Sequence, residues 1–516
     1  MCFGNKKSGT LYSFNHFHSL TMEEEEDNLE KLLKWAAELG ISDSKNGGHS
    51  CLGHSLVVSY FHGAGGRGLG AARHLEKGEL VLSVPKSALI TTQALLLRDD
   101  RLSLAVSAHS SLSPTQRLSV CLLYEMGKGK ASWWHPYLIN LPRSYDIVAT
   151  FGEFEKQALQ VDDAIWAAEK AIAKAEFEWK ETNALMEQLK LKPQLRTFRA
   201  WLWASATVSS RTMHIPWDRA GCLCPVGDLF NYSAPSEESD FENIEHRTHD
   251  LALEDISTVK EEASCMLDME QLDSNSGRLT DGRFEDNLGA YSFYAKKSYR
   301  KGEQVLLSYG TYTNLELLEH YGFLLIENPN DKVFVPLEPE IYSSCSWPKE
   351  SLYIHQSGKP SFTLLSALRL WATPVSQRRS VGHLAYSGHQ LSIENEMFIM
   401  RWISKKCDNT MKNLPTTLKE DVFLLAVIDK IQNVDAPFEF GNLSSVSVNE
   451  ICTFRATLLK KGDSEALSRK TMQRLRERWR LAIEWRLSHK KILVDCMSFC
   501  DEMIHVLSSQ IVHSQR

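Results

Sequence analysis

The stretch PVGDLFNYS at residues 225–233 decides the fold of this chain when it is taken together with three other segments. Alone it is a weak signal, because an asparagine in a loop most often supports a turn. The information lies in the order and separation of the segments. From the N-terminus they are GGRGLG at 65–70, SSR at 209–211, the quoted stretch, and SYG at 308–310 with Asn314, YGF at 321–323 and NPND at 328–331.

The glycine cluster at residues 63–70 lies between two predicted strands, Leu56–Phe61 and Glu79–Val84. No Gly-Lys-Ser/Thr sequence ends it, which excludes a Walker phosphate loop. A strand follows it instead of a helix, which disfavours a dinucleotide-binding loop. By itself the cluster is typical of a turn.

The other elements of the first half are predicted from periodicity and stop signals. Helical stretches lie at 28–40, 114–126, 155–190 and about 195–209. Two strands are predicted at Tyr291–Ala295 and Gln304–Tyr309, and a short helix at Asn314–Tyr321, with Gly322 in the position that ends a helix.

Together, in this order, the four segments resemble the SET domain. The nearest resemblance is to the subgroup typified by the plant Rubisco large-subunit and cytochrome c lysine methyltransferases. It spans roughly residues 28–510 and is strongest around 63–90, 209–233 and 291–336. It implies an α+β fold, in which a SET domain of small β-sheets with a helical insertion is joined to an all-α C-terminal domain.

The resemblance also implies a domain organisation. Residues 1–27 are expected to be a disordered extension. Residues 28–336 are expected to form a split SET domain, with a helical insertion at about 95–205 and an acidic loop at 236–288, where Asp and Glu are concentrated. Residues 340–516 are expected to form a helical domain like the substrate-binding domain of Rubisco methyltransferase.

The activity implied by the resemblance is transfer of a methyl group from S-adenosylmethionine to a lysine of a protein substrate. Tyr309 is the implied catalytic residue, because a tyrosine hydroxyl suits the positive charge that moves from sulfur to nitrogen. Arg211 is placed beside the cofactor carboxylate, for which a guanidinium is a bidentate partner. The implied cofactor-binding residues are Arg67, Gly68, Leu69, Arg211, Asn231 and Tyr232, and the substrate-binding residues are Arg211, Asp228, Tyr309 and Tyr321.

One departure from the family pattern leaves alternatives open. The family has Asn-His where this chain has Asn231-Tyr232. If the second residue acts through its backbone, tyrosine preserves the site; if the imidazole is needed, cofactor affinity falls. A catalytically silent SET-domain binding protein is therefore a second hypothesis. A third is a protein-histidine methyltransferase, since the subgroup includes one.

Composition restricts the class of protein further. The chain has 516 residues, 24% charged and 43% hydrophobic, with a net charge of -7, which disfavours a nucleic-acid partner. Its 11 cysteines show no paired metal-ligand spacing, so we predict no metal site and reduced thiols. No apolar run is long enough to span a membrane. We expect a monomer in the cytoplasm, the nucleus or both, with the chloroplast as an alternative.

The C-terminal half is predicted to be helical, with capping boxes at Thr417–Glu420 and Ser447–Glu450 and one or two long helices over 463–510. Residues 469–491 are basic. A solvated helix face is favoured over a nucleic-acid-binding or calmodulin-binding helix, because apolar residues at helical spacing supply a core stripe. The resemblance adds a docking surface for an acidic protein substrate.

Overall fold

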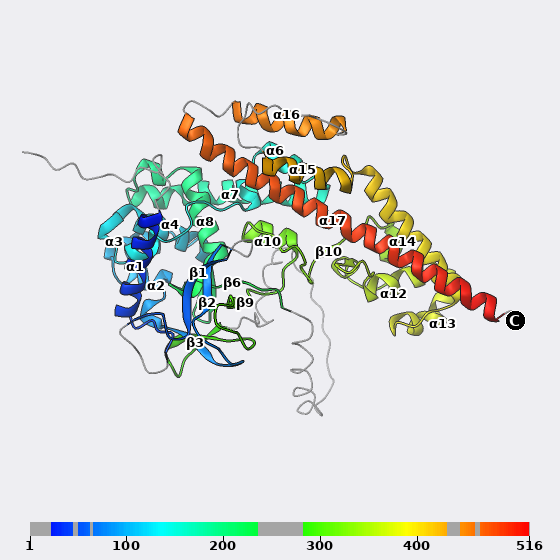
Figure 1. Cartoon of the computed structure of the whole chain (residues 1–516), viewed down its shortest axis with the longest axis horizontal. Coiled ribbons are helices and arrows are strands. Elements are labelled where there is room, and N and C mark those ends of the chain that lie inside the picture. The colour runs from blue at the N-terminus through cyan, green and yellow to red at the C-terminus, as the bar shows by residue number, and fades with distance from the viewer. Residues whose placement is uncertain are drawn as a thin grey trace, which may run out of the picture. The chain divides into compact units, whose positions relative to one another are not determined.

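The computed structural model describes residues 22–44, 50–61, 66–235, 282–430, 444–459 and 465–514 (Figure 1). The chain divides into two compact units. The first, called the SET unit, contains Met1–Ser144 and Ala175–Thr311. The second, called the helical unit, contains Tyr145–Lys174 and Tyr312–Arg516.

Small sheets make up the β structure of the SET unit, which confirms the predicted α+β class. Three of them are antiparallel: β1 (Leu56–Phe61) with β2 (Gly66–Ala71), β4 (Thr212–Ile215) with β5 (Asp218–Leu223), and the order β3 (Leu80–Pro85), β8 (Ala290–Tyr294), β7 (Gly282–Glu285). The fourth pairs β6 (Asn231–Tyr232) with β9 (Leu306–Leu307) in parallel.

The second half of the glycine cluster differs from its prediction as a turn, because it forms strand β2. Gly66 pairs with Phe61, and Arg67 pairs with Tyr60. The strand β1 therefore supplies the ladder that holds Gly68 and Gly70 in a strand, although glycine itself disfavours strands. Gly66, at the start of β2, has a φ of 74°. Leu69 is fully buried in the core of this unit.

Helices cover the rest of the SET unit. They are α1 (Met22–Glu38), α2 (Thr92–Leu96), α3 (Asp100–Ser107), α4 (Pro114–Lys128), α5 (His135–Leu138) and α8 (Phe198–Arg211), with the C-terminal part of α7 (Asp162–Gln188). A capping box fixes the start of α4, where Ser113 accepts from the Gln116 backbone and the Gln116 side chain accepts from the Ser113 backbone.

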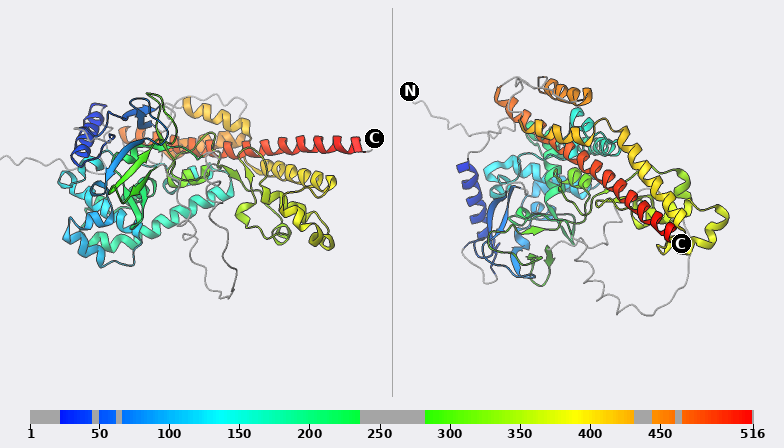
Figure 2. Two further views of the ribbon diagram at one scale, coloured as in Figure 1. Left: turned by 90° about the horizontal axis from the view of Figure 1, so that it is seen from below. Right: turned by 45° about the vertical axis from the view of Figure 1, so that its right-hand side comes forward.

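The helical unit contains the N-terminal part of α7 and nine further helices, with one short sheet, among its described residues. These are α6 (Glu153–Gln157), α10 (Asn314–His320), α11 (Pro339–Ser343), α12 (Phe362–Trp371), α13 (Val375–Tyr386), α14 (Ile393–Asn413), α15 (Leu418–Lys430), α16 (Ser445–Leu459), α17 (Glu465–Ser514), and β10 (Lys332–Val333) with β11 (Ile354–His355). Figures 1 and 2 show α14 running along the C-terminal part of the long helix α17.

Three predicted segments differ from the structure or lie partly outside the described residues. The predicted long helix over 155–190 is interrupted, since Gln160 has a φ of 62° and separates α6 from α7. The acidic loop predicted at 236–288 lies outside the described residues up to 281, and Gly282–Glu285 form strand β7. The extension predicted at 1–27 lies outside the described residues up to 21.

One of the two predicted capping boxes is confirmed and the other is wrong. The hydroxyl of Thr417 accepts from the Glu420 backbone and the Glu420 carboxylate accepts from Thr417, which confirms the first box. The second is wrong, because Ser444 caps α16 and Glu450 accepts from the indole of Trp479. Among the described helices, none has the length and apolarity needed to cross a bilayer.

The predicted solvated face at 469–491 is wrong for two cations near its C-terminal end. Arg486 and Lys490 on α17 are both 0% exposed. Arg486 lies 2.8 Å from the carboxylate of Asp421 and 3.0 Å from that of Glu450, and Lys490 lies 2.5 Å from Asp421. These charges are interior because acidic residues on α15 and α16 meet them there, which periodicity along one helix does not reveal.

Candidate functional site

The stretch at residues 225–233 turns sharply inside the SET unit. Val226 is fully buried and has a φ of 67°, a strained conformation for a β-branched residue. A Cβ on Gly227 would lie 2.7 Å from both the thiol of Cys224 and the ring of Phe293, so only glycine fits this packing. The turn carries Asp228 into the site and leads directly into β6.

An ion pair joins the end of α8 to this turn. The guanidinium of Arg211 donates from Nη1 to the Asp228 carboxylate at 2.8 Å and to the Asp228 carbonyl at 3.0 Å. The same carboxylate oxygen accepts from the Tyr137 hydroxyl at 2.8 Å. The Asp228 side chain is 3% exposed, so these two donors fix its orientation in a largely dry environment.

The side-chain amide of Asn231 on β6 contacts strand β2. The Asn231 side chain donates to the Arg67 carbonyl at 3.5 Å. A Cβ on Gly68 would lie 2.5 Å from the Asn231 Nδ2 atom and 2.9 Å from the Gln304 Nε2 atom. The sequence resemblance implied Gly68 as a cofactor-binding residue. In the structure, the close approach at Gly68 is that of the Asn231 and Gln304 side chains.

Two tyrosines from β6 and from the segment after β9 lie together. The Tyr309 hydroxyl donates to the Phe230 carbonyl, and the Tyr232 hydroxyl donates to the Gly310 carbonyl at 2.8 Å. Their ring centroids are 5.2 Å apart. Each tyrosine thus bonds the backbone within two residues of the other one, and the pair links β6 to the segment that carries Tyr309.

Two cations and two anions act on the electrostatics around Arg67. Burial lowers the pKa of the Arg67 guanidinium, and the nearby positive charge of Arg211 lowers it further, while the negative charges of Asp228 and Glu25 raise it. The Arg67 guanidinium donates to the Asn140 carbonyl at 2.8 Å. Arg67 and Arg211 therefore lie close enough together for their charges to interact.

The phenol of Tyr309 is protonated at neutral pH. Burial raises its pKa above the usual value, and the negative charge of Asp228 acts in the same direction, while Arg211 opposes them. A neutral hydroxyl at this position both donates a hydrogen bond and presents oxygen lone pairs.

The structure therefore brings together most of the residues predicted from the sequence. The SET unit assembles Arg67, Gly68, Leu69, Arg211, Asp228, Asn231, Tyr232 and Tyr309. Tyr321 belongs to the helical unit, where its hydroxyl donates to the Tyr312 hydroxyl at 3.3 Å. Within the described ranges, no cluster of three or more His, Cys, Asp or Glu side chains is arranged to hold a metal ion.

Three residues of the site carry no sequence signal that predicts their part in it. Tyr137 orients Asp228, Asn140 holds Arg67, and Gln304 packs against Gly68. The structure places Tyr137 in the short helix α5. Their partners lie far away in the chain, so only the folded unit identifies them.

Comparisons with known proteins agree on one architecture. A family model described as Rubisco LSMT substrate-binding matches residues 340–493. The chain is 54% identical over 497 residues to Protein SET DOMAIN GROUP 40 of Arabidopsis thaliana, covering 94% of this chain and 98% of that protein. It is 24% identical over 443 residues to an actin-histidine N-methyltransferase of Otolemur garnettii, covering 79% and 65%. The crystal structure of the SET domain of LSMT bound to lysine and AdoHcy matches with a TM-score of 0.56 at 17% identity, over 93% of each chain.

Proposed function

Because the chain belongs to the Rubisco LSMT-like family of SET-domain proteins, we propose that it transfers a methyl group from S-adenosylmethionine to a lysine side chain of another protein. The observation that carries the proposal is the parallel pairing of β6 with β9. This pairing sets Asn231 beside Gly68 and Tyr232 beside Tyr309, and so joins the cofactor-binding residues to the catalytic one.

The residues present fit the cofactor. Arg211 is close enough for its charge to lower the pKa of Arg67, and Asp228 and Glu25 act in the opposite direction. The carboxylate of S-adenosylmethionine would pair with these two guanidiniums. The Asn231 amide and the backbone of Gly68 and Leu69 are the polar groups that would hold the rest of the molecule. When bound, the cofactor supplies an electrophilic methyl group on a sulfonium.

The protein's own part in the reaction is orientation and charge stabilisation. The Tyr309 hydroxyl is held on the Phe230 carbonyl, so its oxygen is fixed before the substrate binds. An oxygen fixed in this way favours positive charge at the reacting nitrogen without reorganisation. Tyr232 supports this arrangement through its ring and its bond to the Gly310 carbonyl, which favours a working enzyme over a silent binding protein.

A histidine acceptor is the second candidate. It is supported by the 24% identity to an actin-histidine N-methyltransferase, whereas the similar LSMT structure is bound to lysine. The test is incubation of the protein with S-adenosylmethionine and protein fractions, followed by mass spectrometry of modified peptides. Methyl-lysine supports the first candidate, and methyl-histidine supports the second.

The Arg211→Ala variant is expected to bind S-adenosylmethionine at least tenfold more weakly than the wild type, because it loses the guanidinium that would pair with the cofactor carboxylate. Calorimetry measures the affinity of the variant and of the wild type. A micromolar Kd corresponds to a binding free energy of about 8 kcal/mol in magnitude. Arg199→Ala, an exposed arginine on the same helix, is the control and keeps wild-type affinity. Absence of wild-type binding at millimolar ligand in a folded protein would refute the enzymatic proposal.

The Gly68→Ala variant is expected to lose cofactor affinity with little loss of stability. The new Cβ displaces the flexible Asn231 amide, which lies 2.5 Å away, and the end of a side chain moves more cheaply than backbone. Thermal unfolding and calorimetry separate the two effects. Gly382→Ala, where a Cβ meets nothing within 4 Å, is the control. Unchanged affinity in Gly68→Ala would remove Asn231 from the cofactor site.

A further inference from the structure

One short segment at the end of α5 contacts the charged groups of the candidate cofactor site at two points. The Tyr137 hydroxyl donates to the Asp228 carboxylate at 2.8 Å, on the oxygen that also accepts from Arg211. Three residues later, the Asn140 carbonyl accepts from Arg67 at 2.8 Å, and the Asn140 side-chain oxygen accepts from the same guanidinium at 3.4 Å. The Asn140 N–H donates to the Tyr137 carbonyl at 2.9 Å, so both contacts come from a single tight turn.

This turn is anchored to two helices of the SET unit. On one side, the Asn140 side chain donates to the Asn28 carbonyl of α1 at 2.8 Å. On the other side, the Pro142 carbonyl accepts from the Trp203 indole of α8 at 2.8 Å. Because α8 ends at Arg211, the turn and this arginine are fixed to the same helix.

Two guanidiniums in one site need fixed partners, because like charges repel each other. The positive charge of Arg211 lowers the pKa of Arg67, after the larger effect of burial. Arg211 donates twice from Nη1 to Asp228, and the hydroxyl of Tyr137, which is 2% exposed, is a second donor to the Asp228 carboxylate. A carboxylate held by two donors has less freedom to rotate, and so has the guanidinium paired with it.

We propose that Tyr137 and Asn140 are positioning residues for recognition of the carboxylate of S-adenosylmethionine, an inference that rests on the proposed function. Tyr137 holds Arg211 through Asp228, and Asn140 holds Arg67 directly. Both guanidiniums are thereby oriented before the cofactor binds. The loss of rotamer freedom of two long side chains then occurs on folding and does not oppose binding of the cofactor.

The probes are S-adenosylmethionine and its decarboxylated form, which keeps the sulfonium and the amine but lacks the carboxylate. Calorimetry with the full-length protein measures both dissociation constants, and their ratio is called the carboxylate preference. The variants are Tyr137→Phe, which removes one hydroxyl and keeps the ring, and Asn140→Ala. Circular dichroism and thermal unfolding verify that each variant is folded.

Tyr124→Phe is the matched control for Tyr137→Phe. The Tyr124 hydroxyl donates to the Asp99 carboxylate at 3.1 Å, and that carboxylate pairs with Lys128 at 2.9 Å. The control therefore removes a tyrosine–aspartate–cation contact of the same kind, in the same unit but outside the cofactor site.

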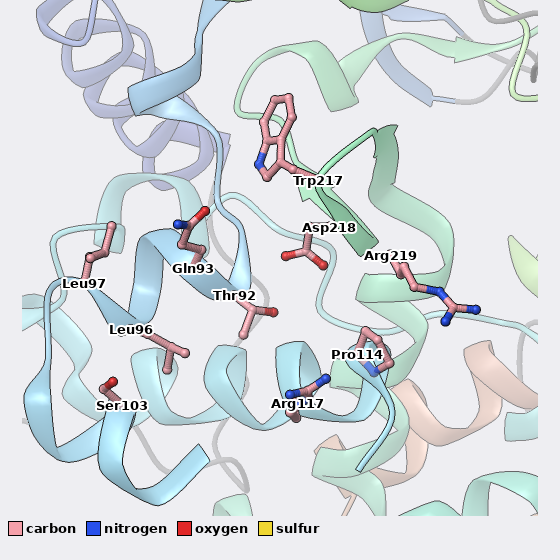
Figure 3. A pocket seen from close by; sticks show the side chains of 10 residues that line it. All are labelled: Thr92, Gln93, Leu96, Leu97, Ser103, Pro114, Arg117, Trp217, Asp218 and Arg219. Carbon is pink, nitrogen blue, oxygen red and sulfur yellow. The ribbon is translucent and has the colours of Figure 1, made fainter. Parts of the chain in front are cut away.

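The control for Asn140→Ala comes from a separate pocket of the SET unit. This pocket of about 450 Å³ is lined by residues of α2, α3, α4 and the β4–β5 hairpin, and none of the cofactor-site residues lines it (Figure 3). Gln93, labelled on α2 in Figure 3, has an exposed side-chain amide. Gln93→Ala therefore removes an amide away from the cofactor.

The wild type is expected to prefer S-adenosylmethionine over the decarboxylated form by about tenfold or more, the usual effect of a hydrogen-bonded charge. Tyr137→Phe and Asn140→Ala are each expected to reduce this preference by about threefold or more, with little change in affinity for the decarboxylated form. Both controls keep the wild-type preference. Adding Tyr137→Phe to Arg211→Ala is expected to cause no further loss, because Tyr137 acts through Arg211.

Equal weakening of both ligands in a folded variant would show a merely structural role and overturn the proposal for that residue, as would an unchanged preference. Equal affinity of the wild type for the two ligands would also overturn it, but would leave the proposed function in place if the protein methylates an acceptor. Absence of S-adenosylmethionine binding by the folded wild type would refute both.

Discussion

Tyr309→Phe is expected to reduce methyl transfer by about a hundredfold or more while leaving binding of S-adenosylmethionine unchanged. Loss of one preorganised polar group at a developing charge typically has this magnitude. The substitution removes only the oxygen that bonds the Phe230 carbonyl, and it keeps the ring that packs 5.2 Å from Tyr232. The fold of the SET unit is therefore retained.

The measurement is single-turnover transfer of a labelled methyl group to a protein acceptor, with calorimetry of the cofactor on the same preparation. Tyr294→Phe is the matched control, since its hydroxyl donates to Glu285 at 2.7 Å in the same unit but outside the site. Full transfer activity in Tyr309→Phe would remove this residue from the reaction. Loss of cofactor binding together with activity would instead assign it to the cofactor site.

Asp421→Ala is expected to lower the free energy of unfolding of the helical unit by about 3–5 kcal/mol, the range for removal of one partner from a buried ion pair. The carboxylate lies 2.8 Å from Arg486 and 2.5 Å from Lys490, and all three side chains are 0% exposed. Its removal takes away the carboxylate that Lys490 donates to, and among the described residues the remaining acceptors of its hydrogen bonds are the Thr416 oxygens and the Gln160 side chain.

The loss of unfolding free energy is measured by urea unfolding, monitored by circular dichroism. Asp408→Ala is the control, because its ion pair with Lys412 is exposed and lies within one helix turn, where about 0.3–0.5 kcal/mol is usual. Combining Asp421→Ala with Lys490→Met is expected to cost less than the sum of the two single changes. A loss in Asp421→Ala no larger than in Asp408→Ala would show that the network does not stabilise the fold.

Local signals predicted part of the molecule well. Thr417 and Glu420 cap α15, and Gly322, with a φ of 78°, ends the short helix α10. These features depend on residues within four positions of one another, so the sequence contains all the groups involved. The failure at Ser447 and Glu450 follows from the same limit, because Arg486 and Trp479 on another helix bind that glutamate.

In the candidate site, too, the sequence predicted which residues take part, and the structure alone revealed their contacts. The residue types and their order predicted Arg67, Arg211, Asn231 and Tyr309 as members of one site through a family resemblance. Their contacts depend on separations of 164 residues for Asn231 with Arg67 and 79 for Tyr309 with Phe230. Periodicity and capping do not act over such distances.

The sequence by itself thus determined the family, the α+β class and the positions of the local helix signals. Only the tertiary structure decided that Gln160 interrupts a helix, where its side chain accepts from Thr416 at 2.8 Å. It also decided that Arg486 and Lys490 are interior and that Tyr137 orients Asp228. The physical reason is that burial and ion pairing depend on groups brought together from distant parts of the chain, and these interactions outweigh local preference.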